Sequence, residues 1–186
     1  MATVIQRGRI IQDPGFIQTL FNDPRAAVLW LAVRVWLGYQ WVEAGLHKVG
    51  NPAWTQTGDA LKGFWTGAVQ VPAEGRPPIT FEWYRSFIQF MLDAEAYTWF
   101  AKLVAYGEVL IGIALILGIF TGIAAFFGGF MNWNFMMAGS ASSNPLLFVA
   151  ALGLVMAWKI AGYIGVDYFL LPAIGTPWGR TKKVTS

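Results

Sequence analysis

Ionisable side chains interrupt an apolar run that extends from residue 25 to residue 49. The run is long enough to cross the hydrocarbon core of a bilayer, which takes about 20 apolar residues, yet it contains Arg34, Glu43 and His47. A charged side chain that faces lipid costs at least ~2.5–3.5 kcal/mol on insertion scales. These side chains should therefore face protein, a cavity or a partner, where a carboxylate or an imidazole can carry a proton.

Helical spacing separates the polar residues of this run into two stripes. One stripe consists of Arg34, Gly38, Trp41, Gly45 and Lys48. The opposite stripe consists of Trp36, Gln40, Glu43 and His47. We expect the first stripe to pack against neighbouring helices through its two glycines, because small residues allow helices to approach closely. The second stripe should line a cavity or meet a partner.

A second acid, Glu108, lies near the centre of the apolar run 97–118. At about 1.5 Å of rise per residue, Glu108 and Arg34 differ in depth by about one helical turn. This match predicts a buried ion pair between them, which either fixes the register of the helices or leaves Glu108 able to handle a proton in quinone chemistry. Glu43 and Lys102 match in the same way near the outer surface.

The composition is typical of a membrane protein, since 56% of the 186 residues are hydrophobic and 12% are charged. Without cysteine the chain has no disulfide, no thiolate nucleophile and no thiolate ligands for an iron–sulfur cluster. One histidine cannot supply a bis-His haem, and a single His–carboxylate pair has too few ligands for a metal site. No covalently bound cofactor is expected, so a redox cofactor would be diffusible, such as a quinone, or belong to a partner subunit. The net charge of +3 does not indicate nucleic-acid binding.

Four apolar runs predict an all-α integral membrane protein, a four-helix transmembrane bundle with short interfacial helices. The runs cover residues 26–49, 97–118, 122–140 and 144–165. Asp23-Pro24 and Asn144-Pro145 are typical helix starts, because the first residue can cap the helix and proline has no N–H to leave unpaired.

The remaining segments flank or connect these runs. Residues 1–24 should form a cytoplasmic segment with a short surface helix, 25–172 the four-span domain and 173–186 a basic cytoplasmic tail. Residues 50–96 form an aromatic loop that is too polar to span, and its stretch 79–95 has the pattern of an interfacial amphipathic helix. This loop either packs on the ends of the helices or covers a substrate site as a lid.

The charge distribution predicts the topology. Basic residues gather near the two ends of the chain: Arg7, Arg9, Arg25, Arg180, Lys182 and Lys183. The 50–96 loop is net acidic. Basic segments stay on the cytoplasmic side, so both termini should be cytoplasmic, as an even number of spans requires. The first 25 residues do not have the pattern of a cleavable signal, and the expected location is the plasma membrane of a prokaryotic cell.

Several motifs resemble those of the DoxX/DoxD family over roughly residues 25–172. They are Arg34-x3-Gly38, Glu43-Ala44-Gly45-x2-Lys48, Gly107-Glu108 with the following LIGIALILGIFTG, and Asn144-Pro145. The resemblance implies four spans with a large outer loop after the first. The DoxD branch is similar to the membrane subunit of thiosulfate:quinone oxidoreductase, which passes electrons from thiosulfate to a membrane quinone. Other members resemble membrane anchors in oxidative-stress or sulfur-metabolism complexes.

Two functions follow as expectations. The chain is either a quinone-linked redox subunit that acts on thiosulfate or a related sulfur compound at the outer face, or a non-catalytic accessory subunit of a larger membrane complex. A homo-oligomer or partner subunits are expected in both cases. Candidate catalytic residues are Glu108, Arg34, Glu43 and His47. Candidate substrate-binding residues are Lys48, Lys102, Asn132, Asn134 and Arg85.

Overall fold

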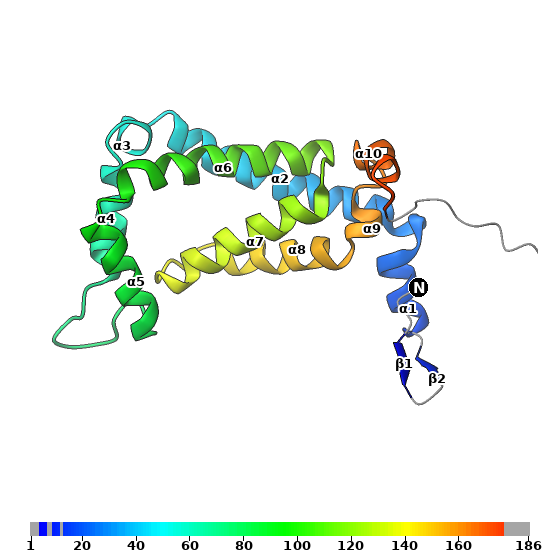
Figure 1. The fold of residues 1–186 in the computed structure, drawn as a ribbon, viewed down its shortest axis with the longest axis horizontal. Helices are drawn as coiled ribbons and strands as arrows, with labels where there is room; N and C mark the ends of the chain where they lie inside the picture. The colour runs from blue at the N-terminus through cyan, green and yellow to red at the C-terminus, as the bar shows by residue number, and fades with distance from the viewer. Residues whose placement is uncertain (1–3, 7–8, 12, 177–186) are drawn as a thin grey trace, which may run out of the picture.

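The structure is a computed structural model that describes residues 4–6, 9–11 and 13–176 (Figure 1). Four of the basic residues used for the topology, Arg7, Arg180, Lys182 and Lys183, lie outside these residues, as does most of the 173–186 tail. The described chain is helical apart from a short antiparallel hairpin, which the sequence analysis did not predict. Its strands are β1 (Val4–Gln6) and β2 (Arg9–Ile11).

Four long helices form two antiparallel pairs (Figure 1). One pair is α2 (Ala27–Val49) and α6 (Tyr97–Leu117), and the other is α7 (Thr121–Met137) and α8 (Asn144–Met156). The pairs meet near the turn between α6 and α7 and diverge toward the other end of the bundle, as Figure 1 shows. Among the described residues, α6 is the one helix that is long and apolar enough to cross a bilayer.

Short helices cover the divergent end. They are α3 (Pro52–Thr55), α4 (Asp59–Ala68) and α5 (Glu82–Asp93), all from the predicted loop 50–96. Tyr84 and Ile88 of α5 are buried, whereas Phe87 is 46% exposed. The amphipathic pattern of 79–95 is therefore confirmed as a helix. This segment forms a cap across the opening between the two helix pairs.

The N-terminal helix starts are also as the sequence predicts. Helix α1 (Gly15–Asn22) is the expected short helix before the bundle. Asp23 accepts a 2.9 Å hydrogen bond from the Arg25 N–H, and Pro24 opens the short 3₁₀ helix η1 (Pro24–Ala26) that leads into α2. This is the cap-and-proline start, because the side chain satisfies an N–H that has no partner within the helix.

The prediction that the fourth helix continues to residue 165 is wrong. Helix α8 ends at Met156 and is followed by α9 (Trp158–Ala161) and α10 (Asp167–Ala173). The chain turns back because the N–H groups of Val166 and Asp167 donate to the carbonyls of Leu117 and Gly118, at 3.1 and 2.8 Å. These two bonds tie the segment before α10 to the end of α6.

Glycines bring α2 and α6 into backbone contact, as the first stripe predicts. A Cβ on Gly38 would lie 2.8 Å from the Gly112 carbonyl oxygen and 2.8 Å from Cγ1 of Ile116. A Cβ on Gly112 would lie 2.6 Å from the backbone nitrogen of Val42. All three distances are shorter than real Cβ contacts, so any side chain here must push the helices apart. Gly38 and Gly45 are buried, which confirms that this stripe faces α6.

We expect Gly38→Leu to lower the free energy of unfolding by several kcal/mol. The neighbouring atoms include a backbone carbonyl, which cannot move aside as a side chain can, and overpacking already costs ~1–3 kcal/mol where repacking is possible. The measurement is a thermal melt in detergent. Gly63→Leu is the matched control, because Gly63 is exposed on α4 and a Cβ there meets nothing within 4 Å. A Gly38→Leu variant that melts with the parent would show that α2 does not approach α6 at this residue.

Candidate functional site

A buried ion pair joins α2 to α6 at the divergent end. Lys48 Nζ lies 2.6 Å from Oε2 of Glu108, and the side chains are 20% and 1% exposed. The ammonium also lies 3.5 Å from the Ala44 carbonyl oxygen and 5.3 Å from the ring centroid of Trp54. Burial removes most of the water around both charges. In the ion pair, each charge stabilises the other in place of that water.

The predicted ion pair between Arg34 and Glu108 is therefore wrong. Glu108 lies eleven residues into α6, yet it packs beside Gly45, which is only four residues from the end of α2. Helix α6 thus extends about two turns, or ~10 Å, beyond α2. The depth estimate treated the two helix ends as level, and this offset moves Glu108 from the level of Arg34 to that of Lys48.

Arg34 lies at the opposite end of the bundle from Lys48. The two residues are about 21 Å apart along α2 at 1.5 Å per residue. Arg34 is 1% exposed, and its Nη2 donates to the Ile164 carbonyl at 2.7 Å. Its guanidinium fits between Gly118 and Gly165, where a Cβ on either glycine would collide with Nη1. Arg34 is therefore built into the joint between the two helix pairs, away from Glu108.

Asp167 completes this joint, and the sequence analysis gave it no role. Its carboxylate accepts hydrogen bonds from the N–H groups of Phe120 and Thr121, at 2.6 and 2.8 Å. These groups open α7 and have no partner within the helix, so a fully buried carboxylate from 46 residues away acts as the cap. Gly118, at φ 71°, makes the turn that presents them. The sequence did contain one signal for this role of Asp167, a single acidic residue that follows a glycine-rich stretch.

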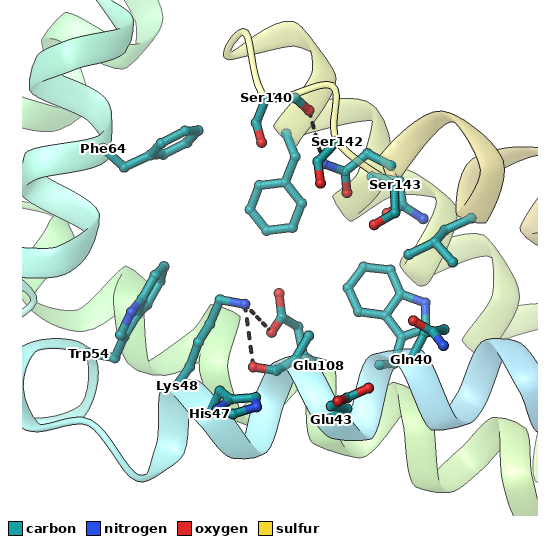
Figure 2. A pocket seen from close by; sticks show the side chains of 16 residues that line it. Gln40, Glu43, His47, Lys48, Trp54, Phe64, Glu108, Ser140, Ser142 and Ser143 are labelled. Carbon is teal, nitrogen blue, oxygen red and sulfur yellow. Dashed lines mark hydrogen bonds and ion pairs between the residues drawn. The ribbon is translucent and has the colours of Figure 1, made fainter.

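A cavity of about 480 Å³ opens beside the Lys48–Glu108 pair. It lies between α2, the segment that holds α3 and α4, and the turn from α7 to α8. Figure 2 shows Lys48 and Glu108 reaching toward each other, with Trp54 and Phe64 on one side and the turn's serines on the other. Polar lining residues besides the ion pair are Gln40, Glu43, His47, Asn132, Ser140, Ser142, Ser143 and Asn144.

Two buried groups in the cavity wall lack hydrogen-bond partners. Both polar atoms of the Asn132 side chain and Nε1 of Trp41 are buried without a partner among the described residues. Asn132 is 0% and Trp41 2% exposed. Since about nine in ten buried polar groups are hydrogen-bonded in folded proteins, these unpartnered groups set this part of the cavity wall apart from an ordinary protein interior. They offer three N–H donors, two on Asn132 and one on Trp41, and one carbonyl acceptor beside an ammonium and a carboxylate.

The structure brings some of the predicted site residues together. Glu108, Lys48 and Asn132 share the cavity, and the exposed residues Glu43 and His47 line it from α2 (Figure 2). Within the described chain, no group of three or more His, Asp or Glu side chains is placed to hold a metal ion. The cavity is therefore lined by groups suited to hydrogen bonding and proton transfer.

Other predicted residues lie elsewhere. The predicted ion pair between Glu43 and Lys102 is not formed. The ion pairs among the described residues are Lys48–Glu108 and Arg85–Glu82. Lys102 is exposed and Arg85 lies on α5, and neither lines the cavity. The prediction failed because α6 is offset along α2, which separates the levels of Glu43 and Lys102.

Asn134 of α7 accepts hydrogen bonds that connect α5 to α7. The hydroxyl of Tyr84 donates to its Oδ1 at 3.0 Å and lies 3.2 Å from its carbonyl oxygen. Burial raises the pKa of Tyr84 to about 12, so the hydroxyl remains a donor at physiological pH. Asn134 itself donates to the Phe130 carbonyl at 2.8 Å. Asn132 and Asn134 therefore have different roles although they are two residues apart.

Comparison with known proteins identifies one family. The family model described as DoxX matches residues 29–141, from α2 through the end of α7. The matched region contains Lys48, Glu108 and Asn132 and ends before Asp167. Neither a curated protein nor a solved structure matches the chain.

Proposed function

Because the chain belongs to the DoxX family and is thus a membrane protein, we propose that it is the membrane subunit of a quinone-linked redox complex. The cavity beside Lys48 and Glu108 would bind the quinone head. The observation that supports this proposal is the set of buried, unpartnered groups on Asn132 and Trp41 in the wall of that cavity. A quinone head presents two carbonyl acceptors, which match N–H and ammonium donors.

The chemistry assigned to this chain is binding and proton transfer. Reduction of a quinone takes two electrons and two protons. In the ion pair Lys48 carries the proton and Glu108 is a carboxylate. Lys48 is therefore placed to stabilise the negative charge that grows on a quinone oxygen and to give it a proton, and Glu108 to return a proton from water to Lys48. The electrons come from thiosulfate or a related sulfur compound, through a partner subunit that holds the redox centre, since this chain offers no cysteine ligands.

The proposed membrane arrangement has four spans with both termini in the cytoplasm of a prokaryotic cell. The cavity then lies toward the outer face, because the α3–α5 segment follows the first span. Helix α8 has 13 residues, about 20 Å, so the bilayer must thin locally or α9 must complete the crossing.

A single cysteine tests this topology, because the chain has none of its own. Ser186→Cys should stay unlabelled when intact cells are treated with a membrane-impermeant maleimide, and should label after the membrane is opened. A cysteine at exposed Gln70, just after α4, is the matched control and should label from outside. Labelling of the Ser186 variant in intact cells would contradict the arrangement.

Asn132→Leu tests the quinone site itself. Leucine has nearly the same size and removes two buried atoms that have no partner, so the fold should melt at the parent's temperature or above. Quinone reduction by the native complex should fall by at least about tenfold, the effect of losing one hydrogen bond to a bound group at a buried site. The control is Gln70→Leu, an exposed residue that lies outside the cavity. Full activity in the Asn132→Leu complex would place the quinone elsewhere.

The accessory-subunit function rests on a different observation. Glu43 and His47 are exposed on α2, where a partner could cover them. In this case Glu43→Arg should release a partner subunit during purification from native membranes, while Asn132→Leu should leave the activity of the whole complex unchanged. The two variants therefore separate the two functions.

A further inference from the structure

A second cavity of about 600 Å³ lies between α4, α5, α6 and α7. Its walls are almost entirely apolar and aromatic, with Leu61, Trp65, Met91, Leu103, Phe127 and Met131 among the lining residues. Cavities of this size and character are typical of sites that hold small apolar molecules or the apolar part of larger ones. The ion pair described above is not part of this cavity.

The two cavities adjoin. Phe64 of α4 and Phe135 of α7 line both of them, so these two aromatic residues form the wall that the cavities share. Two consecutive residues of α6 face different cavities: Gly107 lines the apolar one and Glu108 the polar one. A molecule with a polar head and an apolar chain could therefore occupy both cavities at once.

The apolar cavity is open toward the outer surface of α6 and α7. Its lining residues Leu103, Leu110 and Phe130 are 57%, 66% and 50% exposed. Because α6 is apolar and long enough to span a bilayer, this opening faces the acyl chains. At the far end, the hydrogen bond from Tyr84 to Asn134 holds α5 across the cavity.

We infer that the two cavities form one site for an amphiphile, with the isoprenoid tail of the quinone in the apolar cavity and its head beside Lys48 and Glu108. This inference rests on the proposed function. The charges favour a neutral head: the one ammonium in the polar cavity is already neutralised by Glu108, and Glu43 adds a negative charge at its edge. A phospholipid would bring a phosphate to that place without a free cation to pair with it.

Tethering explains why the tail would leave the bilayer. An apolar chain gains no hydrophobic free energy when it moves from lipid to protein, so only packing contacts in an otherwise unfilled cavity favour the move. A chain attached to a bound head is present at a high effective concentration, whereas a free lipid chain is not. Occupancy of the apolar cavity should therefore depend on binding of the head.

Gly107→Leu fills the apolar cavity with little disturbance elsewhere. A Cβ at Gly107 meets nothing within 4 Å, and replacing an interior helix glycine improves helix propensity. The matched control is Gly63→Leu, which also meets nothing within 4 Å but lies on the exposed face of α4, outside both cavities. Both variants should fold at least as well as the parent, as a melting curve would confirm.

The experiment uses the full chain in phosphatidylcholine vesicles and three probes. These are a dimethoxybenzoquinone without a tail, the same head with a ten-carbon tail that ends in a diazirine, and a phosphatidylcholine with a diazirine on one chain. Binding of the tailless probe is followed by quenching of tryptophan fluorescence, since Trp41 and Trp54 line the polar cavity. The positions of photolabelling are mapped by mass spectrometry.

The tailed quinone should label residues of the apolar cavity, such as Met91 and Met131, and an excess of the tailless quinone should reduce this label at least about tenfold. Gly107→Leu should reduce it as well, because the leucine side chain takes the space and the packing contacts that the tail would otherwise have, while Gly63→Leu should not. The tailless quinone should bind to the parent and to the Gly107→Leu variant equally well.

The other outcomes separate the inference from the proposed function. If the tailless quinone binds but the tailed quinone labels only the outer surface, the inference fails and the proposed function stands. If the tailless probe does not bind the parent, both fail. Labelling of the same residues by the phospholipid probe, without displacement by quinone, would make the cavity a lipid site and overturn the inference.

Discussion

Glu108→Gln should lower the free energy of unfolding by about 3 kcal/mol, and Lys48→Met by about 5 kcal/mol. These values are the two ends of the range found when one partner of a buried ion pair is removed. The difference follows from exposure, because the Lys48 side chain is 20% exposed and can turn to water when left alone, whereas the Glu108 side chain is 1% exposed. Thermal or denaturant unfolding in detergent measures both losses.

The double variant Lys48→Met/Glu108→Leu separates pairing from burial. It leaves no unpaired charge, so it should recover most of the stability that either single variant loses. Combining Arg34→Met with Glu108→Leu should not recover this stability, because Arg34 lies at the other end of α2 and does not pair with Glu108. If both single variants melt with the parent, the ion pair makes no contribution to the fold and Glu108 is free to act in chemistry alone.

Asp167→Asn should cost about 3 kcal/mol, since a hydrogen bond to a charged group contributes roughly 1.5–3 kcal/mol and an N–H left buried without a partner costs about 1–3 kcal/mol. Asparagine keeps the shape but loses the charge beside the buried guanidinium of Arg34. One carboxamide end is also an N–H donor, so it cannot accept the hydrogen bonds that both Phe120 and Thr121 now donate. The expected loss therefore combines a poorly capped α7 with the loss of the charge attraction between Asp167 and Arg34.

Thr121→Val is the control for this variant. The Thr121 hydroxyl is buried without a hydrogen-bond partner, so its removal should leave stability unchanged or slightly raise it. The backbone N–H that Asp167 caps remains in place. An Asp167→Asn protein that melts with the parent would mean that the backbone bonds from residues 166 and 167 hold the joint without the carboxylate.

The start and the contact face of α2 could be predicted from local sequence, whereas the helices α3, α4, α9 and α10 and the end of α8 were not. The cap-and-proline start at Asp23 and the glycines of α2 indicate structure through properties of a few neighbouring residues. Those properties are hydrogen-bonding capacity, φ preference and side-chain size. The same is true of the amphipathic helix α5, whose buried residues Tyr84 and Ile88 recur at helical spacing.

The ion pairs could not be predicted in this way, because they depend on how far one helix is shifted along another. A shift of about two turns changes which charge meets Glu108, and the connecting segment of 47 residues between α2 and α6 leaves that shift unspecified. The partners of Asp167 were unpredictable for a related reason, since they come from the tight turn before α7. The cavity residues Ser140, Ser142 and Ser143 likewise join the site only once α7 and α8 pack together.

The arrangement of the helix pairs has a mechanical consequence. They are fixed to each other at the joint of Arg34 and Asp167, while at the divergent end they are bridged through α5 (Figure 1). A rotation of only about 5° at the joint would move the far end of a ~30 Å helix by about 2.6 Å. A rotation about the joint would therefore move the parts of the helices that line both cavities. Residues that never touch a ligand would therefore set how much room it finds.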